Sequence, residues 1–264
     1  MAEEGRITSG ALRPLVLVAG ACLGGWAWRD VAARLRLRGH EVFPVTLTGL
    51  GERVHLGHAG VDLETHIDDV VKLLEYEGLD DAVLVGHSYA GLVVTGVADR
   101  APERLSAVVY LDAGPVPDGV AVVDLQPPEQ REAERLAVER EGDGWRWAVP
   151  DRAALSTGAY GSVSGLDDSH FALIAERATP QPYATFTSPL RLSGRPPHER
   201  RVAIFGTDGG MNLELLRRLA EEGDPRAGVF AEPGWELHEL PTGHWSMFSA
   251  PGPLAELLHR VASV

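Results

Sequence analysis

A serine stands at a sharp turn in the segment Gly86-His87-Ser88-Tyr89-Ala90-Gly91. An apolar run precedes it and helix-forming apolar residues follow it, so the segment predicts a buried strand that turns directly into a helix. Such a turn strains the backbone of the serine and tolerates only small residues two positions away, here Gly86 and Ala90. The pattern is G-x-S-x-G with alanine in place of the last glycine. Ser88 is therefore predicted to be an exposed nucleophile at the positive end of a helix.

A serine nucleophile needs a base, and histidine is suited to that role near neutral pH. His244 follows a predicted strand at 236–240 and a glycine, which places it at the same sheet edge as Ser88. His87 is adjacent to the serine but is expected to point away from it. A carboxylate must then orient the imidazole. Asp112 and Asp208 both qualify, because each follows a predicted strand and either one gives the chain order Ser, Asp, His.

The loop Gly20-Ala21-Cys22-Leu23-Gly24-Gly25 follows the first predicted strand. It lacks the G-x-G-x-x-G spacing and the Lys-Ser/Thr pair of phosphate-binding loops. We interpret it as a loop that presents a backbone N–H to the reaction centre, with Ala21 as the donor.

A second glycine-rich loop contains His55 and His58. These two residues are too few for a metal site, and we interpret them as solvated. Asp68 and Asp69, on the helix predicted next, are expected to face water.

Short apolar segments alternate with amphipathic ones along most of the chain. The predicted strands are 15–19, 41–45, 83–86, 107–111, 201–206 and 236–240, and the predicted helices of the core are 26–38, 63–77, 211–222 and 253–262. This alternation is typical of an α/β fold with a mostly parallel central sheet flanked by helices.

The segment 115–200 has a different character, with prolines, charges and aromatic residues but no apolar strand-like runs. Two helices are predicted in it, at 130–141 and 169–177. We interpret the segment as a mainly helical lid inserted into a core formed by residues 1–114 and 201–264. Its aromatic residues suit an apolar substrate pocket or the lid's own small core.

Composition limits the classes of function. A net charge of −14 over 264 residues argues against nucleic-acid binding, which needs a basic surface. The single cysteine, Cys22, excludes an internal disulfide and suits a reducing compartment. The N-terminus has no apolar signal core and no run is long enough to cross a bilayer, so a cytoplasmic protein without membrane contact is expected.

The chain resembles the α/β-hydrolase superfamily, and within it the group of plant methylesterases and hydroxynitrile lyases with their bacterial relatives. The resemblance covers nearly the whole chain. It is carried by the segments 20–26 and 86–91, by Gly243-His244, and by Thr179-Pro180-Gln181-Pro182 with Pro189-Leu190, which is similar to the bacterial branch. It implies Ser88 as nucleophile, His244 as base, and the backbone N–H groups of Ala21 and Tyr89 as the oxyanion hole.

Three positions depart from that group. Ala19 replaces the histidine that usually precedes the glycine after the first strand, which could reshape the loop that follows. The acid position of the plant members falls on Gly209 without a gap, one residue past Asp208, and this offset favours Asp112 as the acid. Trp245 replaces the lysine with which the lyases hold the cyanide charge, so cyanohydrin cleavage is not expected.

These observations predict a serine hydrolase, specifically a carboxylesterase that acts on a small-molecule ester, small or aromatic, without metal or organic cofactor. The side chains predicted to contact the substrate are those of Cys22, Leu23, Trp145 and Trp245. A cofactor-free lyase or cyclase that acts on an aromatic or polyketide-like intermediate is the alternative, because one fold hosts many chemistries. A third hypothesis is a receptor-like protein that binds a small ligand without turnover. The sequence is also compatible with a homodimer.

Overall fold

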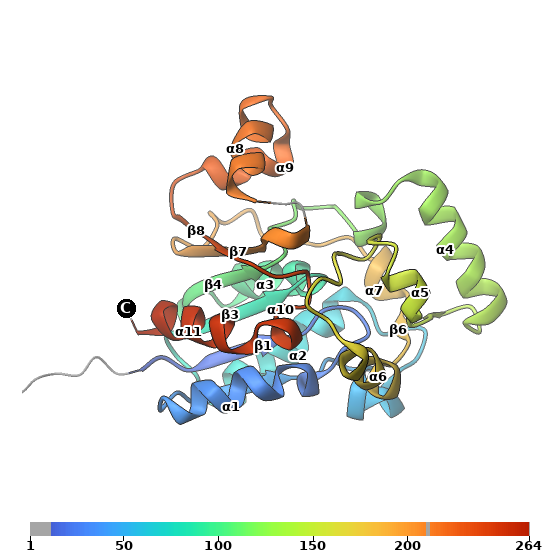
Figure 1. Ribbon diagram of the computed structural model, residues 1–264, viewed down its shortest axis with the longest axis horizontal. Coiled ribbons are helices and arrows are strands. Elements are labelled where there is room, and N and C mark those ends of the chain that lie inside the picture. Colours follow the sequence, from blue (N-terminus) through green and yellow to red (C-terminus); the bar gives the residue numbers. More distant parts are fainter. Residues whose placement is uncertain (1–11, 210–211, 264) are drawn as a thin grey trace, which may run out of the picture.

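The computed structural model describes residues 12–209 and 212–263 (Figure 1). Its centre is a six-stranded sheet in which all paired strands are parallel, in the order β2-β1-β3-β4-β7-β8. The strands are β1 (Leu15–Val18), β2 (Val42–Val45), β3 (Ala82–His87), β4 (Leu105–Leu111), β7 (Arg201–Gly206) and β8 (Trp235–Leu240). The parallel α/β architecture predicted from the sequence is confirmed.

Alternate residues of β1 pack against different layers of helices, as a strand buried on both faces requires. Leu15 and Leu17 belong to a core shared with α1 (Arg29–Leu37) and α11 (Pro251–Ala262). Val16 and Val18 belong to a second core shared with α2 (Leu63–Tyr76) and α3 (Ala90–Arg100). The apolar stripes of these helices are what fix the sheet between them.

Smaller elements complete the core. Phe205 on β7 packs with Leu216 of α8 (Leu213–Glu221) and Ala227 of α9 (Pro225–Gly228). The helix predicted from residue 26 starts with a 3₁₀ turn, η1 (Gly25–Trp28), and the helix predicted from residue 211 starts at Leu213, with residue 211 outside the described residues. The remaining short elements of the core are η2 (Gly51–Leu56), η3 (Pro102–Arg104), η5 (Thr207–Gly209), η6 (Val229–Ala231) and α10 (Ser246–Ser249).

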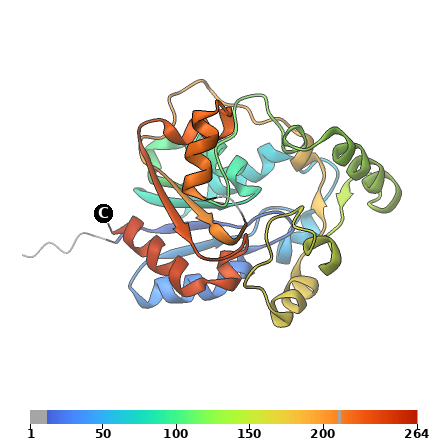
Figure 2. The same cartoon turned by 45° about the horizontal axis from the view of Figure 1, so that its top comes forward.

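The segment between β4 and β7, which we call the insertion (residues 115–200), gathers at one end of the sheet (Figures 1 and 2). It contains the two expected helices, α4 (Pro128–Glu141) and α6 (Asp168–Arg177). It also contains η4 (Val122–Leu125), α5 (Arg152–Leu155) and α7 (Ala184–Thr187). Two short strands that the sequence did not predict, β5 (Arg146–Trp147) and β6 (Gln181–Pro182), pair antiparallel.

No helix in the described parts of the chain is both long and apolar enough to span a lipid bilayer.

Candidate active site

Ser88 occupies the turn between β3 and α3, and its backbone lies in the left-handed region with φ of +53°. That conformation costs a residue other than glycine about 1–3 kcal/mol. The N–H of Ser88 donates to the carbonyl of Leu111, and the N–H of Gly91 donates back to Ser88 at 2.8 Å, so the turn is held on both sides. A Cβ at Gly86 would lie 2.7 Å from the carbonyl oxygen of Ala90, which is why the turn needs glycine there.

His244 donates from Nδ1 to Oδ2 of Asp112 at 3.0 Å, and the other carboxylate oxygen accepts the N–H of Gly206 at 2.7 Å. The two side chains of this pair are each 15% exposed. Asp112 follows β4 and has a left-handed backbone with φ of +45°. With Nδ1 carrying the proton, Nε2 of His244 is left as the basic nitrogen. The carboxylate thus fixes the imidazole tautomer that a general base needs.

Asp208, the alternative acid, is exposed and lies elsewhere. Its carboxylate accepts the hydroxyl of Ser164 in the insertion at 2.8 Å, and its backbone N–H donates to Thr242. The structure therefore brings Asp112, and not Asp208, to the imidazole. The difference arises because the chain turns into η5 directly after β7, which directs Asp208 toward the insertion.

His87 does not point away from the site, contrary to the sequence-based expectation. Its ring lies 4.6 Å from the ring of His244, and its Nε2–H donates to the carbonyl of His244 at 3.0 Å. Complete burial lowers the pKa of His87 well below its usual value, with the nearby His244 adding to the effect. His87 is therefore a neutral support beneath the imidazole of His244.

The loop after β1 is held in a strained shape at Cys22, whose φ is +64°. The insertion binds both polar backbone groups of this residue. The N–H of Cys22 donates to Oε1 of Gln181 at 2.9 Å, and its carbonyl accepts the N–H of Thr179 at 3.0 Å. Gln181 is fully buried, and its Nε2 donates to the hydroxyl of Thr185. This arrangement fixes the backbone next to Ala21.

The backbone N–H groups of Ala21 and Tyr89 donate no hydrogen bond to any described residue. Both residues line the same cavity as Ser88. Tyr89 is also the N-cap of α3, so its N–H lies at the positive end of an eleven-residue helix. Free N–H donors in this position can stabilise an oxygen that becomes negatively charged during reaction.

The side chain of Tyr89 is anchored beneath the cavity. Its hydroxyl donates to Nδ1 of His66 at 2.8 Å, and Nε2–H of His66 donates to the carbonyl of Thr48. The N–H and hydroxyl of Thr48 donate in turn to Asp69, which also pairs with Arg53. The expectation that Asp69 faces water is therefore wrong, because its side chain is 11% exposed and accepts three hydrogen bonds, two from Thr48 and one from Arg53.

His66 is fully buried, and desolvation lowers its pKa to about 4, although its hydrogen bond to Thr48 and the nearby Asp69 act in the opposite direction. It is neutral at physiological pH and serves as a fixed donor and acceptor. Cys22 is likewise buried, and its burial raises the pKa of the thiol to about 12. The cysteine is therefore a neutral wall residue and not a competing nucleophile.

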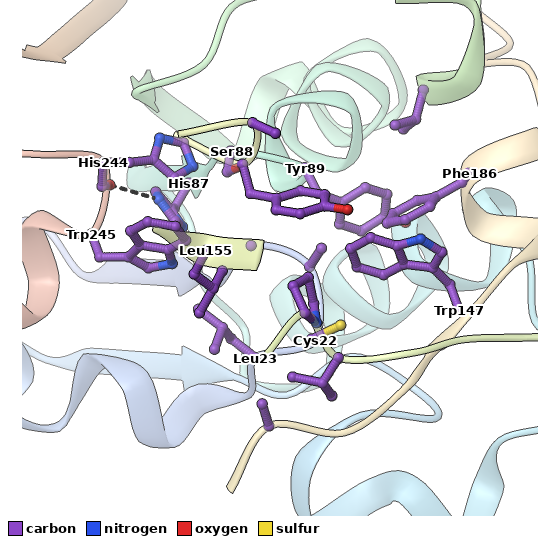
Figure 3. Close-up of a pocket in the computed structure, with 18 of the residues that line it drawn as sticks. Cys22, Leu23, His87, Ser88, Tyr89, Trp147, Leu155, Phe186, His244 and Trp245 are labelled. Atoms are coloured by element: carbon purple, nitrogen blue, oxygen red, sulfur yellow. Dashed lines mark hydrogen bonds between the residues drawn. The ribbon is translucent and has the colours of Figure 1, made fainter. Parts of the chain in front are cut away.

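The cavity has a volume of about 470 Å³, with Ser88 and His244 at one end and Trp147 and Phe186 at the other (Figure 3). Of the residues predicted to contact substrate, Cys22, Leu23 and Trp245 line it. Its other lining side chains are mostly apolar and come largely from the insertion: Val122, Leu125, Pro127, Val149, Pro150, Leu155, Ala159, Tyr160, Ile174 and Ala178. Such a lining suits an apolar or aromatic ligand.

Trp145, also predicted to contact substrate, does not line this cavity. It precedes β5 and its ring lies against Gly57 and under the guanidinium of Arg146, 5.2 Å from the ring centre. Trp147 takes the expected place instead, packed against Tyr160 and Phe186. The two tryptophans are only two positions apart, and the sequence contains no signal that shows which of them lines the cavity.

His55 and His58 are exposed, as expected. Within residues 12–209 and 212–263, no group of three or more histidine, cysteine or acidic side chains is arranged to hold a metal ion.

The sequence matches the model of the alpha/beta hydrolase family over residues 15–257. A carbendazim-hydrolysing esterase of Nocardioides sp. (strain SG-4G) is 37% identical over 253 residues, which span 92% of this chain and 97% of that protein. Methylesterase 9 of Arabidopsis thaliana is 27% identical over 272 residues, which span 95% of this chain and 98% of the plant protein.

Among solved structures, an extracellular alpha/beta-hydrolase from a Paenibacillus species superimposes with a TM-score of 0.76 and 20% identity. The match covers 95% of this chain and 99% of that one. At this identity the likeness concerns the fold, and it agrees with the parallel sheet and flanking helices described above.

Proposed function

Because the chain belongs to the alpha/beta hydrolase family, we propose that it is a carboxylic ester hydrolase that works through an acyl-enzyme on Ser88. The observation that carries the proposal is the bond between His244 and Asp112 at the edge of the cavity that also exposes Ser88. Relatives along nearly the full length of the chain are named as esterases, in agreement with this reaction class.

In the proposed cycle, the Ser88 hydroxyl attacks the ester carbonyl while Nε2 of His244 takes its proton. Asp112 stabilises the imidazolium that forms. The hydroxyl of Ser88 makes no hydrogen bond with any described residue, and bonds of this kind commonly tighten only once substrate is in place. His244 then protonates the leaving alcohol and activates a water, which releases the acid and restores the serine.

The N–H groups of Ala21 and Tyr89 are the proposed oxyanion hole. One such donor lowers the barrier by about 3–4 kcal/mol. The strain at Ser88 and Cys22 supports this role, since it holds the nucleophile and the loop beside Ala21 in fixed positions before substrate arrives. Trp245 follows His244 where the related lyases have lysine, which leaves no cation there for cyanide.

The proposed substrates are small or aromatic esters, because most of the cavity is apolar and its volume suits a compact molecule. In this proposal the insertion acts as a lid that covers the substrate. We further propose that the protein works in the cytoplasm, on small molecules and without a nucleic-acid partner, consistent with its charge of −14.

A fluorophosphonate probe and p-nitrophenyl acetate test the proposal together. The probe should label wild-type protein at Ser88, and Ser88→Ala should lose labelling and at least about 10⁴-fold in kcat with an unchanged circular dichroism spectrum. A wild-type protein that resists the probe and turns over no ester would contradict the acyl-enzyme and favour the lyase or cyclase alternative. Calorimetric binding without product would favour a receptor.

A further inference from the structure

A second cavity borders the pair formed by His244 and Asp112, and it is separate from the cavity that contains Ser88. Its volume is about 1000 Å³, and the proposed catalytic cycle makes no use of it. Its walls come from the ends of β4 and β7, from the second half of α3, from α8 and α9, and from the two ends of the insertion. A cavity of this size is within the range of small-molecule binding sites.

The imidazole of His244 is part of the partition between the two cavities. Among the described residues, only His244 and Leu125 line both of them. The partition continues through the insertion, where Tyr160 lines the substrate cavity while Gly161 and Ser162 line the second one. Gly161 packs against the ring of His244, and the carbonyl of Ser162 accepts the N–H of His244 at 2.8 Å. The two cavities are therefore separate spaces with His244 between them.

The carboxylate of Asp112 belongs to the second cavity. Asp112 lines that cavity but not the substrate cavity, and its side chain and that of His244 are each 15% exposed. A molecule in the second cavity therefore contacts the pair that supplies the proposed base without competing for the space beside Ser88.

The lining of the second cavity includes a cluster of aromatic and aliphatic side chains. Phe205 and Phe230 pack edge to face with 5.4 Å between their ring centres, next to the buried Leu216. The hydroxyl of Tyr110, which is also in the lining, is already bonded to the hydroxyl of Thr95 at 3.1 Å. Such a lining holds a ligand mainly by apolar contact, because little of it offers a new hydrogen bond.

The charged side chains of the lining already have partners within the protein. The pairs are Arg201 with Glu232, Asp124 with Arg131, Asp99 with Ser193, and Asp112 with His244. Arg195 donates to the carbonyl of Asp99, and Asp224 is also engaged. An ionic ligand would be buried here without an opposite charge of its own, which is costly. The lining therefore favours a neutral ligand.

We propose that the second cavity binds a neutral aromatic molecule, and that the bound molecule slows the proposed hydrolysis. The binding site does not depend on the reaction, whereas the effect on rate rests on the proposed function. The occupant replaces water next to His244 and Asp112. The imidazolium that forms when His244 takes the proton of Ser88 then loses part of its solvation, so the barrier rises.

N-phenyl-1-naphthylamine, a neutral dye whose fluorescence rises in apolar sites, is the probe for this cavity. At saturating dye, the wild type should lose about fivefold in kcat on p-nitrophenyl acetate, the lower end of the range for two coupled sites. KM should change little, because the dye leaves the space beside Ser88 free. A dye that competed for the substrate cavity would raise KM and leave kcat unchanged.

Matched tryptophan substitutions fill one cavity at a time. Ala98→Trp narrows the second cavity from α3, so it should weaken dye binding by about tenfold and remove the effect of the dye on kcat. Leu219→Trp narrows the same cavity from α8 and should give the same result. Ala178→Trp narrows the substrate cavity instead, and it should keep a dye site of wild-type affinity. Circular dichroism checks that each variant is folded.

Fluorescence titration with the dye reads the binding site without turnover. Dye affinity that survives in Ala98→Trp and Leu219→Trp but falls in Ala178→Trp would overturn the site, because the dye would then occupy the substrate cavity. Dye binding that both second-cavity variants weaken, with no effect of the dye on wild-type kcat, would overturn the coupling to His244. A protein that binds the dye in the expected pattern but turns over no ester would contradict the proposed hydrolysis and leave the binding site standing.

Discussion

The carboxyl edge of the sheet and the insertion hold their residues in different ways. At the sheet edge, Ser88 and Asp112 occupy left-handed backbone conformations, and each is fixed by backbone hydrogen bonds to neighbouring strands. In the insertion, α4 carries ion pairs such as Arg135 with Glu132 on its exposed face, and such pairs add little to stability because water screens both charges. The sheet edge is built for one geometry, while the insertion has more freedom to vary.

The insertion nevertheless contacts the sheet edge at two loops, one that contains Cys22 and one that contains His244. The insertion binds Cys22 through Thr179 and Gln181, and the N–H of His244 donates to the carbonyl of Ser162 at 2.8 Å. Gly161 lies so close to the imidazole that a Cβ there would be 2.4 Å from the ring. The insertion therefore does more than line the pocket, because it also supports the backbone of the loops that contain Cys22 and His244.

The largest effect that tests this difference between the sheet edge and the insertion is expected from substitution of Asp112 and Asp208. Asp112→Asn should lower kcat by about 10³–10⁴-fold, because an amide can no longer select the tautomer and stabilise the imidazolium. Asparagine tolerates the left-handed backbone at this position, so the fold should persist. Asp208→Asn changes a side chain that contacts Ser164 rather than the imidazole, and should change kcat by a few-fold at most. Steady-state kinetics on p-nitrophenyl acetate measures kcat of both variants, and circular dichroism checks that both are folded. A larger loss of kcat in Asp208→Asn than in Asp112→Asn would show that Asp208 is the acid that orients His244.

An intermediate effect is expected where the insertion holds the sheet edge. Gln181→Leu removes the acceptor for the N–H of Cys22, so the loop that contains Ala21 loses its fixed position. We expect kcat to fall about 10–100-fold with little change in KM, since transition-state stabilisation is lost rather than ground-state binding. Gln181→Glu keeps an acceptor in place and should recover part of kcat. A change confined to KM, or no recovery with glutamate, would make Gln181 a purely structural residue.

A smaller effect concerns stability and depends on pH, through the histidine that anchors Tyr89 at the sheet edge. The folded-state pKa of His66 is about 4, below the unfolded value of about 6.5. Its contribution is therefore complete above pH 6.5 and is lost as the pH falls through 4, up to about 3 kcal/mol. Glutamine can accept from Tyr89 and donate to Thr48, so His66→Gln should flatten this acid loss.

Urea unfolding between pH 4 and pH 7 measures that prediction. His58→Gln, in the exposed loop, serves as the matched control and should follow the wild-type curve. Equal acid loss in wild type and His66→Gln would show that other groups set the acid sensitivity of the core.

The sequence by itself determined the parallel sheet and the turn at Ser88, because both are local. Apolar runs of strand length between amphipathic helices specify the layers, and small residues around Ser88 are required by a turn only a few residues long. The placement of His244 at the same edge followed from topology, since parallel strands end on one side.

Only the tertiary structure decided which aspartate meets His244, which tryptophan lines the cavity, and that Asp69 is enclosed. Each of these depends on side-chain directions set by contacts between residues far apart in the chain, such as Asp112 with Gly206 and Cys22 with Gln181. The pattern of residue types carries no record of those directions.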